Sequence, residues 1–109
     1  KYYAAMRDFL KAAKAVFDDV WGKDNYMVTK PVTLKALIRV ATAIAREDGE
    51  PAEGRQQRWE KRIAPWADMV REFREEGFYE RFAAKGEVER VARIQKDLAR
   101  AAGIEIKKT

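Results

Sequence analysis

The stretch NYMVTKPVTLKALIRV, residues 25–40, shows how this chain builds its fold. Pro31 fixes its own φ angle near −65° and lacks an amide hydrogen, so it suits the first turn of a helix. The residues after it place apolar side chains on one helical face, namely Leu34, Leu37, Ile38, Ala41, Ile44 and Ala45. We therefore predict a helix from about residue 31 to 46. Thr29-Lys30-Pro31 is then explained as a helix start, and a chemical site there is the alternative.

The same three- or four-residue spacing recurs on both sides of this stretch. It predicts further helices over residues 2–21, 56–63, 66–76 and 88–102, which end near Gly22, Pro65, Gly77 and Gly103. Residues 46–55 lack large apolar side chains and read as a loop. The fold class is therefore all-α, a compact bundle of about five helices, two of them short, around one core.

Three smaller features complete the predicted core. Phe78, Tyr79 and Phe82 form an aromatic turn that should pack back on the bundle. Tryptophans 21, 59 and 66 fall on apolar faces, so burial is favoured over a role as a ligand platform. Tyr26 is predicted to be buried, with an exposed contact role as the alternative. The alternation in IEIKKT, residues 104–109, is too short to predict a strand.

The composition argues against catalysis. The 109 residues suffice for one domain and are 47% hydrophobic and 38% charged, with no cysteine and no histidine. The chain thus lacks thiolate and imidazole, the usual metal ligands and acid–base groups. The adjacent pairs Asp18-Asp19 and Glu75-Glu76 point apart on a helix and are predicted to be solvated. We expect no enzyme activity, no cofactor and no bound metal.

The ends of the sequence and its apolar runs suggest its setting. No apolar run approaches the roughly 20 residues that a membrane helix needs, and no signal peptide opens the chain. The absence of cysteine fits a reducing compartment. The sequence starts at Lys1 and enters a helical pattern at once, so we expect it to be a fragment of a longer protein.

Basic residues form two rows with helical spacing. Arg55, Arg58 and Arg62 would share one helix face, and Arg93, Lys96 and Arg100 would share another. With a net charge of +5, such rows could neutralise DNA phosphates. Solvated surface is the alternative, because acidic residues are interleaved with both rows. A different hypothesis is a self-association or partner-docking module, which the aromatic residues would serve if they were exposed.

A resemblance to a known family adds to this interpretation. The segment from Tyr2 to Val40, together with RFAAKGEVERVARIQKDL at residues 81–98, resembles the region after the core of DGQHR-domain proteins. This group includes the DndB regulators of DNA phosphorothioation. The matching positions are Phe17, Trp21, Tyr26, Met27, Thr29, Lys30, Leu34, Ala36 and Leu37, with Gly86 leading the last helix.

The resemblance implies a setting rather than a catalytic site. The family's naming motif, Asp-Gly-Gln-His-Arg, cannot occur in a chain without histidine and belongs to an upstream ParB-like α/β domain. No catalytic residue is therefore carried over. The resemblance implies a cytoplasmic helical accessory domain in bacterial DNA-modification or mobile-element biology, with DNA, a second copy or the upstream domain as partner.

Overall fold

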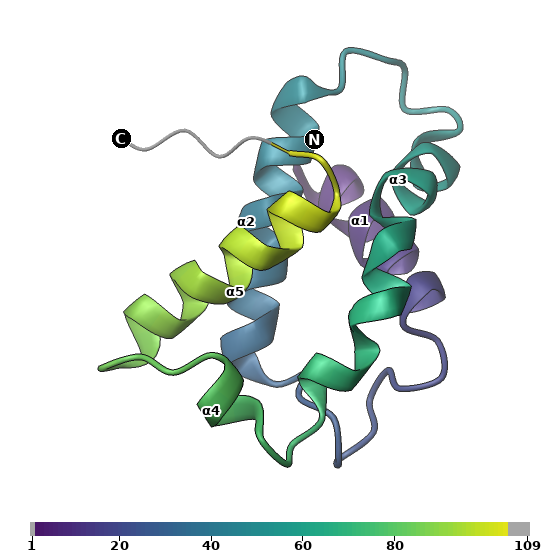
Figure 1. Ribbon diagram of the computed structural model, residues 1–109. Coiled ribbons are helices and arrows are strands. Elements are labelled where there is room, and N and C mark those ends of the chain that lie inside the picture. Colours follow the sequence, from purple (N-terminus) through teal and green to yellow (C-terminus); the bar gives the residue numbers. More distant parts are fainter. Residues whose placement is uncertain (1, 105–109) are drawn as a thin grey trace.

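The fold is all-α, as predicted. Figure 1 shows the computed structural model, which describes residues 2–104. These residues form α1 (Tyr2–Val16), α2 (Pro31–Glu47), α3 (Arg55–Ile63), η1 (Ala64–Phe73), α4 (Phe78–Arg81) and α5 (Glu87–Ala101), where η1 is a 3₁₀ helix. Within them, β-type pairing is limited to an isolated bridge between Tyr26 and Arg74. Of the stretch IEIKKT, only Ile104 is among the described residues.

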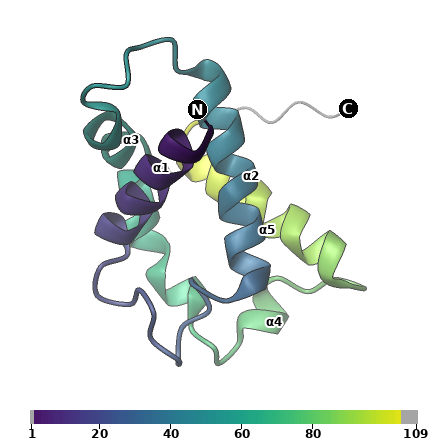
Figure 2. The same cartoon turned by 180° about the vertical axis from the view of Figure 1, so that it is seen from behind.

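The helices form two packed pairs. α1 packs on α3, whereas α2 packs on α5, and η1 contacts α1, α3, α4 and α5. Figure 1 shows α5 crossing in front of α2 on the left of the molecule, with α1 and α3 together on the right. α1 and α2 contact each other much less, and both lie toward the viewer when the molecule is turned around (Figure 2). Because α1 and α2 diverge, they shape the surface of the molecule on this face.

One core joins both pairs, and aromatic rings occupy its centre. Trp66 of η1 is fully buried. Its ring centroid lies 6.1 Å from those of both Phe9 and Phe17 on the α1 side. Its indole Nε1 donates a hydrogen bond of 2.8 Å to the Leu98 carbonyl oxygen in α5. The same residue therefore fills the core and ties η1 to α5, and its only polar atom is satisfied.

The first helix is shorter than predicted. α1 ends at Val16, and residues 17–22 continue as turns, with the amides of Val20 and Trp21 both donating to the Phe17 carbonyl oxygen at 2.9 Å. Asp18 and Asp19 are poor helix formers and place negative charge at the end of the helix dipole where it is unfavourable. Phe17 and Val20 remain buried, which is why the apolar spacing continued past the helix end.

The helix predicted over 66–76 is wrong in type and bounds. It is the 3₁₀ helix η1, which follows α3 directly and takes Pro65 into its first turn. Arg74 is extended because this segment pairs with residues 25–27. The Met27 amide donates to the Phe73 carbonyl oxygen at 2.6 Å, and the Glu75 amide donates to that of Asn25 at 2.9 Å. Gly77, with φ +82°, does not cap η1 and instead precedes α4.

The other predicted helices agree with α2, α3 and α5 to within one residue at each end. The structure has an additional short helix, α4, at the position where the sequence predicted an aromatic turn. Some predicted apolar faces are wrong, because Tyr3, Ile38 and Val88 are 80%, 42% and 78% exposed. Tyr26 is half-buried rather than buried. The predicted exposure of both carboxylate pairs is confirmed for Asp18, Asp19, Glu75 and Glu76.

Candidate functional site

The basic row on α3 makes intramolecular contacts, beginning with Arg55. Its Nε lies 2.8 Å from Asp8 Oδ2 of α1, and the two side chains are only 17% and 18% exposed. Its guanidinium carbon also lies 5.5 Å from the Trp59 ring centroid, within the range of a cation–π contact. Arg55 thus joins α3 to α1.

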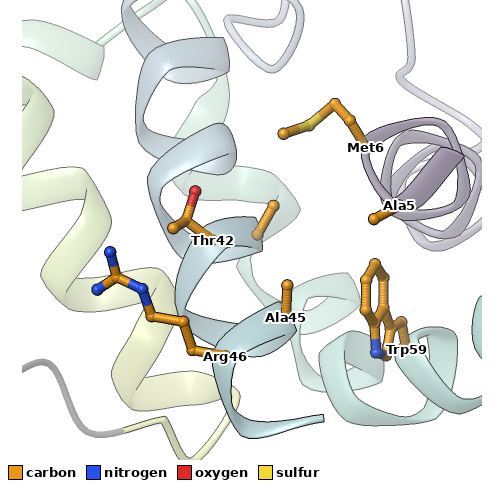
Figure 3. Close-up of a pocket in the computed structure, with 7 residues that line it drawn as sticks. Ala5, Met6, Thr42, Ala45, Arg46 and Trp59 are labelled. Atoms are coloured by element: carbon orange, nitrogen blue, oxygen red, sulfur yellow. The ribbon is translucent and has the colours of Figure 1, made fainter. Parts of the chain in front are cut away.

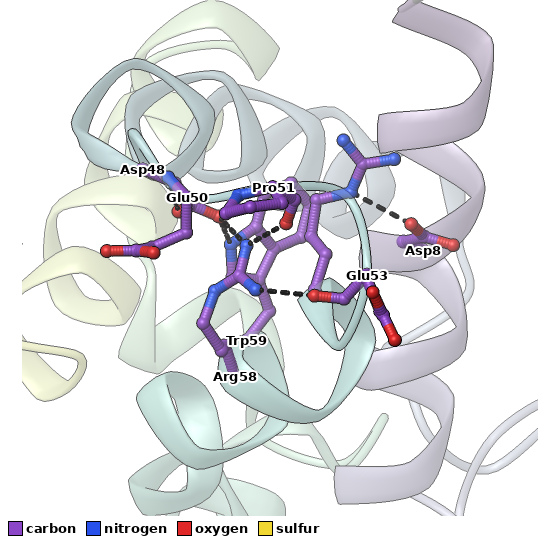
Figure 4. A network of polar contacts seen from close by, with 8 residues as sticks. Asp8, Asp48, Glu50, Pro51, Glu53, Arg58 and Trp59 are labelled. Carbon is purple, nitrogen blue, oxygen red and sulfur yellow. Dashed lines mark hydrogen bonds and ion pairs between the residues drawn. The ribbon is translucent and has the colours of Figure 1, made fainter.

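Arg58 closes the loop between α2 and α3 (Figure 4). Its Nη2 donates to Asp48 Oδ2 and to the Pro51 carbonyl oxygen, each at 2.9 Å, and its Nη1 donates to the Glu53 carbonyl oxygen at 3.0 Å. Asp48 also accepts from Trp59 Nε1 at 2.7 Å and from the Glu50 amide at 3.0 Å. The Asp48 carboxylate therefore accepts hydrogen bonds from three residues, Glu50, Arg58 and Trp59.

The pKa of Asp48 reflects this network. Burial alone would raise the pKa, but hydrogen bonds from Arg58, the Glu50 amide and Trp59, with the positive charge of Arg58, hold it below its ordinary value of 3.8. Asp48 is therefore ionised near neutral pH and fully engaged. It is a structural group rather than an acid–base candidate.

Arg62 attaches the end of α3 to the ends of α2 and α5. Its Nε donates to the Ala102 carbonyl oxygen at 3.0 Å, and its Nη2 lies 3.1 Å from Glu47 Oε1. The three arginines share one face, as their spacing predicted, yet each holds a carboxylate and links α3 to another element. Binding phosphate through them would require breaking these contacts.

The predicted basic row on α5 forms fewer intramolecular contacts than the row on α3. Arg93 donates to the Ala83 carbonyl oxygen at 3.0 Å. Lys96 and Arg100 are exposed, and within residues 2–104 neither forms an ion pair. Of the six predicted contact residues, these two have the cationic groups that are free to meet an anion.

Most of the aromatic residues considered for docking belong to the core. Phe78, Phe82, Trp59 and Trp66 are buried, with Phe73 and Phe82 stacked at a centroid distance of 5.7 Å. Tyr79 is 53% exposed, and the guanidinium carbon of Arg90 lies 4.7 Å from the centroid of its ring. Trp21, predicted to be buried, is half-buried. Most of this aromatic set therefore belongs to the core, and Tyr79 and Trp21 keep part of their surface exposed.

A different apolar surface lies where α1 and α2 diverge (Figure 3). We call it the α1–α2 groove. It encloses about 260 Å³. Met6 and Ala5 of α1 face Thr42 and Ala45 of α2 across it, and Trp59 lies at one end (Figure 3). The residues that line it are Ala5, Met6, Ala41, Thr42, Ala45, Arg46 and Trp59.

A second hollow of about 320 Å³ lies along α1 and shares Met6 with the groove. Its apolar residues are Tyr3, Met6, Leu10 and Trp21, and its basic residues are Arg7, Lys11 and Lys14. We call these three cations the α1 basic edge. Their spacing of four and three residues places them along one side of α1.

The comparisons with protein-family models, with curated proteins and with solved structures found no match. In the described part of the chain, no helix is both long and apolar enough to span a membrane. Residues 2–104 also contain no cluster of three or more acidic side chains arranged to hold a metal ion. The function of the chain is therefore inferred from the geometry of these surfaces.

Proposed function

We propose that this chain is a non-catalytic helical module that binds a segment of a partner protein in the α1–α2 groove. The observation that carries the proposal is an apolar depression between two helices that the fold itself leaves uncovered. Met6, Ala45 and Trp59 line it, and a partner side chain placed there would bury apolar surface.

The dimensions of the groove favour a protein segment over a small molecule. Its volume of about 260 Å³ is below the roughly 300–1,000 Å³ of typical small-molecule sites. A few side chains of a docked helix would fill it, as in other complexes in which an amphipathic helix lies in an apolar groove. The groove also lies beside cations and has no acidic lining residue, which favours a partner of opposite charge.

Selection from a displayed library tests the proposal. The library holds helical peptides of about 15 residues, about 22 Å long, with apolar residues at i, i+3, i+4 and i+7 and random residues elsewhere. We expect the chain to enrich a related set of peptides. The variant Ala45→Gln places a polar side chain in the groove and should release them. Ala92→Gln, at an exposed position of α5, is the matched control and should retain them.

A second candidate function is contact with DNA phosphates, and the free cations Lys96 and Arg100 favour it. Duplex binding by the intact chain, measured against salt, tests this candidate. Loss of both contacts in Lys96→Gln/Arg100→Gln should reduce the slope of log K against log salt by about 0.9 per phosphate. An unchanged slope, or no binding at low salt, would exclude DNA as the partner of this surface.

The resemblance to DGQHR-domain proteins supports a DNA-modification setting for either function. In that setting the chain would be the helical accessory part of a protein that also has a ParB-like α/β domain. The reading frame that encodes Lys1 tests this directly. An Asp-Gly-Gln-His-Arg element upstream would support the family, and its absence would remove this line of support.

A further inference from the structure

We infer that the segment bound in the α1–α2 groove is an acidic amphipathic helix whose carboxylates meet the α1 basic edge. This inference rests on the proposed function and specifies its partner. Three observations carry it: the position of the cations beside the groove, their freedom from ion pairs among residues 2–104, and the absence of acidic residues among those that line the groove and the adjoining hollow.

The α1 basic edge runs parallel to the apolar side of the groove. Arg7, Lys11 and Lys14 line the same hollow as Met6 and Leu10, and Met6 also lines the groove itself. Arg46 of α2 also lines the groove, but its guanidinium lies on the side of α2 away from Met6 and Trp59 (Figure 3). A helix lying in the groove through apolar residues would therefore bring one polar flank over a row of positive charge.

These cations differ from the arginines of α3 in being unneutralised. Among residues 2–104, Arg7, Lys11, Lys14 and Arg46 form no ion pair. Asp8 follows Arg7 in sequence, but its carboxylate is bound to Arg55 at 2.8 Å. No residue that lines the groove or the adjoining hollow is acidic. The positive potential is thus available to a partner. It would strengthen the binding of an acidic helix and fix its orientation in the groove.

The same charge argues against other occupants. A second copy bound face to face would place one α1 basic edge against another, and like charges at an interface are unfavourable. An anionic membrane would also attract a basic helix with apolar neighbours. However, a membrane surface is reached best by protruding side chains. Tyr3 protrudes from the hollow, with 80% of its surface exposed, but the other apolar lining residues, Met6, Leu10 and Trp21, are half-buried. A protein helix fits this shape better.

The library selection described above distinguishes the charge of the partner from docking itself. We expect peptides selected on the intact chain to be enriched in Asp and Glu along one flank. An enriched peptide with these residues changed to Asn and Gln should bind roughly tenfold more weakly, with the difference shrinking at high salt. Arg7→Gln/Lys11→Gln/Lys14→Gln should lose the acidic enrichment. Lys61→Gln/Arg71→Gln/Lys85→Gln removes the same charge from exposed positions elsewhere and should keep it.

Each result decides one question. Enrichment without an acidic bias, released by Ala45→Gln, overturns the acidic partner and leaves docking intact. No enrichment overturns both. An equal effect of the two triple variants overturns the inference, because it shows that only total charge matters. Binding to vesicles containing phosphatidylserine, without selection of peptides, also overturns it in favour of a lipid surface. Circular dichroism of each variant confirms that the helices are intact.

Discussion

Asp48 Oδ2 accepts a hydrogen bond from Trp59 Nε1 at 2.7 Å and another from Arg58 Nη2 at 2.9 Å. One carboxylate oxygen thus connects the loop after α2 to two consecutive residues of α3. Trp59 is buried against Phe9, with ring centroids 6.4 Å apart. The network therefore couples the α2–α3 loop to the packing of α3 on α1.

Removal of the Asp48 charge should destabilise the fold. In Asp48→Asn, the Arg58 guanidinium and the Trp59 indole keep at most a neutral partner in place of a carboxylate. Hydrogen bonds to charged groups contribute about 1.5–3 kcal/mol, so we expect the free energy of unfolding in urea to fall by about 2 kcal/mol. Asp18→Asn, at an exposed position, is the control and should change it little. Equal effects of the two substitutions would contradict the role of the network.

The Asp48 network should also be sensitive to acid. Folding lowers the pKa of Asp48 below 3.8, so the folded state favours its ionised form. The resulting stabilisation is complete above the unfolded pKa and is lost as the pH falls through the folded pKa. The stability difference between the unmodified chain and Asp48→Asn should thus be constant near neutral pH and shrink below about 3.8. Urea unfolding of both proteins across this pH range measures it, and a difference that grows in acid would reverse the assigned sign.

Thr33 offers a stabilising substitution. Its side chain is 1% exposed, and its hydroxyl has no hydrogen-bond partner within the described residues. Thr33→Val keeps the shape and removes an unsatisfied polar atom, which costs about 1–3 kcal/mol when buried. We expect the free energy of unfolding to rise by about 1 kcal/mol. The control is Thr42→Val, which removes an exposed hydroxyl bonded to the Ile38 carbonyl oxygen at 3.2 Å and should give no increase.

Gly77 is required by its backbone conformation. Its φ angle is +82°, and a Cβ would meet only the side chains of Glu80 and Arg81, at 3.6 Å or more. The cost of Gly77→Ala is therefore conformational, and about 1–2 kcal/mol is expected for an L-residue in this region. Thermal unfolding should show a lower midpoint than for Gly49→Ala, where φ is not in this region and the space is open. Equal midpoints would show that the turn before α4 tolerates another conformation.

The sequence predicted well the parts of the fold that depend on local periodicity. Pro31 and the apolar residues after it are sufficient to specify α2, and the same holds for α5. The end of α1 was wrong because the buried Phe17 and Val20 continue the apolar spacing past the helix. The end of η1 was wrong because the pairing of Tyr26 with Arg74 joins segments far apart in sequence. No periodic pattern reports such a contact.

The candidate site was less predictable for a related reason. The spacing of Arg55, Arg58 and Arg62 placed them correctly on one face, but their partners lie on other elements. Asp8, for example, is 47 residues from Arg55. The α1–α2 groove likewise depends on how far two helices diverge, which their separate sequences do not determine. The free cations of α1 were visible as a row, but only the fold shows an apolar groove beside them.

The two basic rows should therefore differ in what they contribute to stability. Arg55→Gln leaves Asp8 partly buried without its ion pair, so we expect a loss of roughly 1–2 kcal/mol, between the values for exposed and buried pairs. Arg100→Gln removes an exposed cation that has no ion pair among residues 2–104 and should change the free energy of unfolding by less than about 0.5 kcal/mol. Urea denaturation of both variants measures the difference. If Arg55→Gln leaves stability unchanged, Arg55 is not a structural link between α1 and α3, and its guanidinium is available to an external anion after all.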